Sequence, residues 1–337
     1  MRSWPIFSTR RGKMAAGISL FALMLAAAAL SLWIGPVRLS AAQVASALLG
    51  RDGASTAARI VLYTRLPRTC AAMLAGAALA VSGVVIQTVL DNPLASPGMM
   101  GVNSSAGLAV ALTCAVSPLA QRYMPAVAFA GALIGALMML ALSQGAGASR
   151  MTVVLAGVAI SHLFSAGIDA VVTFVPDALQ GVTDFRIGGF TGVTMDRLIP
   201  AAWVIFPALL LVLSMSQQMD ILSLGGDTAQ SLGINVRLVR FALLALAAAL
   251  AGAAVSFSGR LSFVGLIVPH ILRRLAGEDS LPLLVGSALG GAFFVTLCDL
   301  LSRVLFAPFE LPVGIVLAFT GAPYFLWLLF RQRRGRG

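Results

Sequence analysis

The sequence predicts an all-α integral membrane protein with ten transmembrane helices, and three observations support this fold class. Hydrophobic residues make up 59% of the chain and charged residues only 10%, and the mean hydropathy is +0.96, far from the balance of a soluble domain. Charge-free runs of at least 18 residues, long enough to span a bilayer as a helix, occur nine times. The basic residues, which give a net charge of +11, lie at the chain ends and between apolar runs. That distribution is a topology signal, so we expect no nucleic-acid partner.

The first run extends from Met14 to Val37 and follows a basic N-terminal segment. A charged start with an apolar middle also describes a signal peptide. The run is long enough to cross the membrane, however, and no A-x-A-like cleavage site ends it. We therefore expect a first spanning helix whose N-terminal side lies in the cytoplasm.

Eight further runs of spanning length follow, and a tenth apolar run is short. The long ones are Thr69–Leu90, Asn92–Gln121, Tyr123–Ser149, Met151–Ile168, Leu198–Met219, Phe241–Gly259, Ser280–Cys298 and Leu311–Phe330. The short one, Leu261–Leu272, has twelve residues, a length more typical of an interfacial segment. The C-terminal tail is as basic as the N-terminal segment, and the positive-inside rule places both in the cytoplasm. An even number of crossings is then required, which predicts that the short run crosses as well.

This topology divides the chain into three parts. Residues 1–13 form a cytoplasmic segment, residues 14–330 form the membrane domain, and residues 331–337 form a basic cytoplasmic tail. The positive-inside rule fails locally, because one group of arginines falls on the outer side and so invites a binding explanation. Its members are Arg38, Arg51, Arg59, Arg65 and Arg68.

A polar, glycine-containing segment, residues 219–240, interrupts the apolar pattern on the predicted cytoplasmic side. Asp227 is suited to cap a short helix that has Gln230 as its third residue, Gly233 to end it, and Asn235 to cap the next helix. Four apolar residues of this segment would then be exposed at the membrane surface. They are Leu222, Leu224, Leu232 and Ile234. Such a surface indicates a contact site for another protein.

The sequence offers little chemistry of its own. The only lysine is Lys13, and Met14 follows it, so a G-x-x-x-x-G-K-[ST] phosphate loop is absent and ATP would have to be hydrolysed by another polypeptide. With only His162 and His270, a transition-metal site is poorly supplied. We also find no acid–base or nucleophilic constellation. The prediction is a protein that is not an enzyme and binds no metal or cofactor itself.

Small polar residues and helix breaks indicate where a transport path could lie. Backbone groups freed at breaks such as Asn92-Pro93 and Ser96-Pro97-Gly98 need protein or water around them, so these segments favour a cavity wall. The fifth run adds hydroxyl and imidazole groups. The candidate wall residues are Asn92, Pro93, Ser96, Ser104, Ser105, Ser161, His162 and Ser165. For His162, a hydrogen-bonded packing role is the alternative.

From Arg65 onward the sequence resembles the FecCD family of binding-protein-dependent ABC importer permeases, and the resemblance covers most of the chain in order. The matching segments are RLPR (65–68), GAALAVSGVVIQTVLDNPLASPGMMGV (76–102), LAGVAIS (155–161), GGF (188–190), LGGDTAQSLGINV (224–236), FVGLIVPHILR (263–273), CDLLSR (298–303) and ELPVGIVLAFTGAPYFLWLL (310–329). The sequence departs from the family pattern at Glu278-Asp279-Ser280, where Asp-His-Arg is usual, and at Asn103, where a Ser-Ser-Gly-Ala stretch usually begins.

The resemblance implies a ten-helix permease with the type II importer fold of cobalamin permeases, located in the bacterial inner membrane. It implies a second permease subunit, identical or closely related, two cytoplasmic ATPase subunits that use ATP, and a periplasmic or lipid-anchored substrate-binding protein. The residues that would contact the ATPase are Leu224, Gly225, Gly226, Asp227, Ala229, Gln230, Leu232, Gly233, Ile234 and Asn235. Arg65, Arg68 and Arg303 would face the periplasm and pair with glutamates of the binding protein.

The expected cargo is an iron–siderophore or related metal chelate, with haem or cobalamin as the alternative within the same family. Two other classes of protein stay open. An ion-coupled secondary transporter would be expected to carry acids in the middle of its spans, whereas the acids here lie at span ends or in loops. An intramembrane enzyme would need the catalytic residues that are missing.

Overall fold

The computed structural model describes residues 10–51, 55–117, 123–145, 150–307 and 309–334, and every regular element in these ranges is helical. Within them, seven segments are long and apolar enough to span a membrane: Met14–Trp33, Thr56–Leu90, Met124–Leu142, Leu155–Phe174, Met195–Ser214, Val236–Ser258 and Ser280–Val304. Val102–Val116 and Val313–Trp327 are shorter apolar helices. The twelve-residue run forms a thirteen-residue helix, Val264–Ala276. Each predicted run thus has a helix, and ten crossings stay a prediction.

The long helices are α1 (Arg10–Trp33), α4 (Leu66–Leu90), α5 (Val102–Val116), α6 (Met124–Gly145), α7 (Arg150–Phe174), α9 (Met195–Ser214), α12 (Val236–Ser258), α13 (Val264–Ala276), α14 (Ser280–Val304) and α15 (Val313–Arg334). The shorter elements are α2 (Ala41–Leu48), α3 (Thr56–Ile60), η1 (Val61–Arg65), η2 (Pro97–Met100), η4 (Pro176–Ala178), α8 (Leu179–Ile187), α10 (Ser216–Ser223) and α11 (Gly226–Ser231).

Helix α4 lies at the centre of the bundle and packs against α9, α12, α13 and α14. Glycines allow the backbones to approach closely at two of these crossings. A Cβ added at Gly76 would lie 2.1 Å from the carbonyl oxygen of Gly291 on α14, and one at Gly83 would lie 1.9 Å from that of Gly265 on α13. No side chain fits in such a space, so both crossings depend on glycine.

The two glycine pairs of G-x-x-x-G spacing also lie at helix contacts. Gly131 and Gly135 of α6 face α5, where added Cβ atoms would come within 2.6 Å of Ala109 and 2.1 Å of Ser105. Gly286 and Gly290 of α14 face Leu272 of α13 at 3.2 and 3.3 Å. The first pair is therefore the tighter contact.

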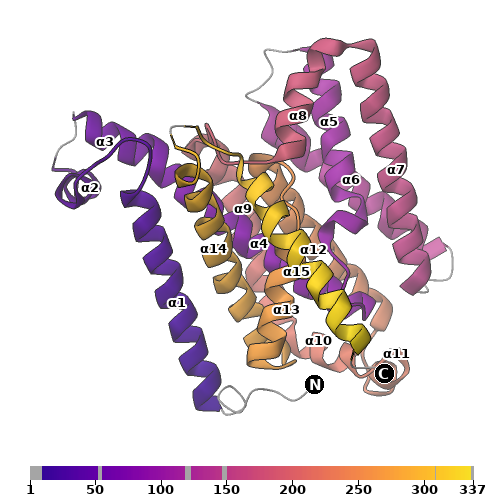
Figure 1. The fold of residues 1–337 in the computed structure, drawn as a ribbon. Coiled ribbons are helices and arrows are strands. Elements are labelled where there is room, and N and C mark those ends of the chain that lie inside the picture. Colours follow the sequence, from indigo (N-terminus) through magenta and orange to yellow (C-terminus); the bar gives the residue numbers. More distant parts are fainter. Residues whose placement is uncertain (1–9, 52–54, 118–122, 146–149, 308, 335–337) are drawn as a thin grey trace.

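The short helices lie at opposite ends of the bundle (Figure 1). α2, α3 and α8 lie at one end, whereas α10 and α11 lie at the other, beside the last turns of α15. The latter end is the one that the sequence predicts to be cytoplasmic. The two ends therefore carry different candidate sites, which are described next.

Candidate functional sites

The segment from Leu224 to Asn235, called here the coupling segment, contains α11 and the turn that leads into α12. Gly225 directly precedes α11 and is its N-cap, and it has φ +107°. The prediction that Asp227 caps this helix is wrong: Asp227 lies within the first helical turn. There its carboxylate still interacts favourably with the positive end of the helix dipole.

The C-terminal end of α11 forms a Schellman motif. The N–H of Gly233 donates to the carbonyl of Gln230 at 3.0 Å, and the N–H of Ile234 donates to that of Ala229 at 3.1 Å. Gly233 has φ +83°, as this motif requires. Asn235 then caps α12, because its side chain accepts from the N–H of Leu238 at 3.1 Å. The predicted helix, glycine and second cap are all confirmed.

The coupling segment exposes large apolar side chains. Leu224 is 62% exposed and Leu232 is 58% exposed, and Ile234 is half-buried. Leu222, which we expected beside them at the surface, is instead buried, because α10 packs against α4 and α14. The exposed apolar surface is therefore narrower than predicted and is centred on Leu224 and Leu232.

A hydrogen bond connects α10 to α14. The carboxylate of Asp220 accepts from the backbone N–H of Ser280, the first residue of α14, at 2.8 Å. Ser280 belongs to the stretch in which the sequence departs from the family pattern. A displacement of α10 would therefore be passed directly to the start of a long helix.

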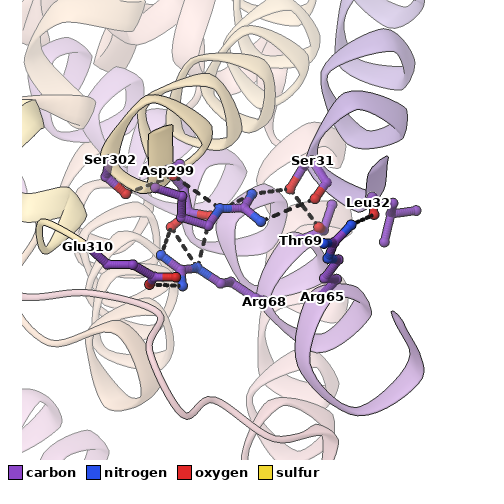
Figure 2. Close-up of polar contacts among 9 residues, drawn as sticks. Ser31, Leu32, Arg65, Arg68, Thr69, Asp299, Ser302 and Glu310 are labelled. Carbon is purple, nitrogen blue, oxygen red and sulfur yellow. Dashed lines mark hydrogen bonds and ion pairs between the residues drawn. The ribbon is translucent and has the colours of Figure 1, made fainter. Parts of the chain in front are cut away.

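At the opposite end of the bundle, Arg68 pairs with Asp299 and Glu310 (Figure 2), and with Arg303 these residues form a charge cluster. Arg68, Asp299 and Arg303 are buried, whereas Glu310 lies at the exposed edge of the cluster. Arg68 of α4 pairs with Asp299 of α14 at 3.0 Å and with Glu310 at 2.6 Å. Arg303 pairs with Asp299 at 3.1 Å, which is the i, i+4 contact that their spacing permits. Two arginines and two acids make the cluster neutral.

Helix α1 is also attached to this charge cluster. Arg303 donates to the hydroxyl of Ser31 at 2.6 Å and to its carbonyl at 3.2 Å, and the hydroxyls of Ser31 and Thr69 lie 2.7 Å apart. Arg65 donates to the carbonyls of Leu32 and Trp33 at 2.8 and 2.6 Å. These contacts fasten the end of α1 to α4 and α14 (Figure 2).

The three arginines assigned to binding-protein docking are thus inside the protein. Arg65 is 4% exposed, Arg68 is 6% and Arg303 is 3%. We expected these side chains to be open to a partner protein. In the single chain, each of them instead donates hydrogen bonds to acceptors within the chain. Their role in docking stays a prediction.

A partly open cavity of about 340 Å³ lies between α5, α7, α8 and the loop that precedes α13. Its lining residues are Gly98, Asn103, Ser104, Gly107, Ser161, Ser165, Ile168, Val182, Phe185, Arg186, Arg260 and Ser262. Ser161, Ser165 and Ile168 are four and three residues apart, so they share one face of α7. We call this space the polar cavity.

Three of the predicted wall residues, Ser104, Ser161 and Ser165, line this polar cavity. The others lie elsewhere. Ser105 is buried and donates to carbonyls of its own helix, and the side-chain oxygen of Asn92 accepts from the N–H of Leu94 in a turn. Pro93 and His162 are exposed, and Ser96 precedes η2. Their place in a transport path stays a prediction.

The sequence interpretation missed the two arginines of the polar cavity, Arg186 and Arg260. Arg186 is on α8, whose charged residues break the hydropathy pattern, so no helix was expected there. Arg260 is the residue directly after the seventh predicted run, Phe241–Gly259. The available signal was that both are basic residues on the predicted outer side, where the positive-inside rule disfavours them.

The fold and these sites define a class of protein: a membrane-embedded transport subunit with a polar cavity between its helices and an exposed apolar segment at one end. The model of the FecCD transport family matches residues 23–331. The chain belongs to this family.

Relatives support the assignment. The hemin transport system permease protein of Yersinia pestis is 40% identical over 82% of this chain and 85% of its own length. The Fe(3+)-citrate import system permease protein of Bacillus subtilis is 35% identical over 97% and 98%. A vitamin B12 import system permease protein of Citrobacter koseri is 39% identical over 81% and 84%.

A solved structure is also similar. It is an inward-facing conformation of an ABC transporter assigned to the metal-chelate type, with a TM-score of 0.82 and 27% identity, covering 94% of this chain and 99% of that one. The fold is therefore that of an ABC importer permease. The chain is a transport subunit, and ATP hydrolysis belongs to partner ATPases.

Proposed function

We propose that this chain is the permease subunit of an importer that carries an iron–siderophore or related metal chelate across the bacterial cytoplasmic membrane. Family membership and the permease relatives named for hemin, Fe(3+)-citrate and vitamin B12 support this proposal. Haem or cobalamin is the alternative cargo. The single observation that carries the mechanism is the exposed apolar coupling segment at one end of the bundle.

The coupling segment is proposed to contact a cytoplasmic ATPase subunit. Leu224 and Leu232 lie at the surface, where apolar side chains gain free energy only when a partner covers them. Closure of an ATPase pair would push α11 and α10, which pack against each other. The hydrogen bond between Asp220 of α10 and Ser280 would then pass that movement to α14. Each complex would contain two permease and two ATPase subunits, and both termini of this chain would be cytoplasmic.

The opposite end is proposed to receive the substrate-binding protein. Docking through Arg65, Arg68 and Arg303 would require the partner's carboxylates to compete with Asp299 and Glu310, because these acids occupy Arg68 and Arg303 in the single chain. Three exposed arginines at the same end need no such exchange. They are Arg38, Arg51 and Arg59.

Co-purification tests the proposed ATPase contact. The full chain, tagged and co-expressed with the phosphate-loop ATPase of its own importer, should retain that ATPase in detergent. Replacing Leu224 and Leu232 together with serine should weaken the complex about a hundredfold or more, since two large apolar contacts of roughly 1.5–3 kcal/mol each are lost. The matched control replaces Leu48 and Leu49 with serine, because these exposed leucines lie at the end of α2, outside the spanning segments and at the opposite end of the bundle. Equal ATPase retention by the wild type and the coupling-segment variant would contradict the proposed contact.

A further inference from the structure

The polar cavity contains two cationic groups that nothing in the proposed transport function requires. Among the described residues that line it, both charged ones are arginines, Arg186 and Arg260, and none is an acid. A chelate that only needed a smooth passage would be served by the serines and small residues alone. Two arginines among the residues that line a cavity favour a ligand that carries negative charge.

The two arginines are brought together by close backbone contact between α8 and the loop that follows α12. The N–H of Arg260 donates to the carbonyl of Phe185, the neighbour of Arg186, at 2.9 Å. Gly259 has φ +64°, and a Cβ on it would lie 2.7 Å from that same carbonyl oxygen. The loop is therefore held against α8, and the backbones of Arg186 and Arg260 have fixed positions relative to each other.

The two guanidinium groups differ in their partners. Arg186 pairs with Asp169 at 2.9 Å, and both side chains are largely exposed, at 47% and 69%. This pair uses the Nη2 group of Arg186, and a guanidinium has five N–H donors in all. Arg260 has no ion-pair partner among the described residues. Arg260 is thus the more available of the two cations.

The rest of the lining has a different character. The hydroxyls of Ser104 and Ser161 donate to the carbonyls of Gly101 and Gly157 in their own helices, at 3.1 and 2.8 Å. Their protons are engaged, so their oxygens are left as hydrogen-bond acceptors for a ligand. Ile168, Val182 and Phe185 add an apolar wall. The volume of about 340 Å³ is in the range of ligand pockets.

We propose that the polar cavity binds the cargo itself and selects a metal chelate with a free anionic group, such as an uncoordinated carboxylate, which pairs with Arg260 and Arg186. The apolar wall would hold the ligand backbone, and the serine oxygens would accept from its hydroxyl or amide groups. This inference rests on the proposed transport function and adds the charge of the cargo to it. An anionic chelate is favoured over a neutral one of the same size.

Equilibrium dialysis with the permease–ATPase complex tests the proposal. The probes are iron(III)–citrate, which is anionic, and a neutral iron(III) trihydroxamate, each labelled with radioactive iron at one fixed ionic strength. The wild type should bind the anionic chelate more tightly. Arg260→Gln should weaken that binding about tenfold, equivalent to roughly 1.4 kcal/mol, and leave any neutral-chelate binding within about twofold. Arg260→Lys should retain part of the preference because it keeps the charge.

Arg197→Gln is the matched control, because Arg197 is a half-buried arginine in the first turn of α9 that does not line the polar cavity. It should leave the affinity for both probes unchanged. Equal binding of the two chelates by the wild type, binding of neither, or equal losses in the Arg197 and Arg260 variants would overturn the proposal. Retention of the ATPase by the same preparations reports on the transport function separately, so the two failures are distinguishable.

Discussion

At the residue scale, the buried charge cluster shows how charge can be placed inside a very apolar protein. Asp299 is fully buried and contacts both Arg68 and Arg303, and Glu310 supplies the second acid. Burial of charge is costly unless it is paired and hydrogen-bonded. Because each of these charged groups has a partner, α1, α4 and α14 can meet at this point.

Removing one acid from the charge cluster should destabilise the protein strongly. Asp299→Asn would leave two buried guanidinium groups with one carboxylate, and breaking a buried pair in this way costs roughly 3–5 kcal/mol. The measurement is the thermal unfolding midpoint of the purified chain in detergent. Asp169→Asn is the control, because the pair with Arg186 is exposed and is expected to contribute at most about 1 kcal/mol. Similar losses in the two variants would contradict the role given to the charge cluster.

At the element scale, the coupling segment shows what local sequence can predict. Gly233 at the end of α11 and the cap at Asn235 were both predictable, because each rests on the chemistry of one residue and its near neighbours. The burial of Leu222 was not, since it depends on α10 packing against α14. Hydropathy similarly found all the long helices but not α8, whose charged residues hide it.

The conformation of Gly233 gives a prediction about coupling. A Cβ on this residue would meet no atom of this chain within 4 Å, so within the chain the effect of a substitution comes from the backbone at φ +83°. Gly233→Val should disfavour that conformation by roughly 1–2 kcal/mol and disturb the connection of α11 to α12. The amount of ATP hydrolysed per chelate transported should rise. Gly233→Asn should retain most coupling, because asparagine tolerates positive φ. Tight coupling in the valine variant would show that the turn is not needed for force transfer.

At the scale of the whole molecule, the chain has a candidate site at each end and a cavity between helices. Sequence patterns predicted the membrane class and the helices, and three serines that they selected for a transport path line the polar cavity. They could not predict that Arg68 meets residues 231 and 242 positions away, or that Arg186 and Arg260 line the same cavity. Such pairings arise from helix packing and have no local signal.

The central claim is that this chain moves a metal chelate by using the ATP hydrolysis of a partner. The most direct measurement is uptake of radioactive iron(III) chelate into proteoliposomes that contain the permease–ATPase complex, with binding protein outside and ATP inside. We predict uptake that requires both the binding protein and hydrolysable ATP and does not respond to a proton gradient. Uptake driven by a proton gradient without the ATPase would contradict the account.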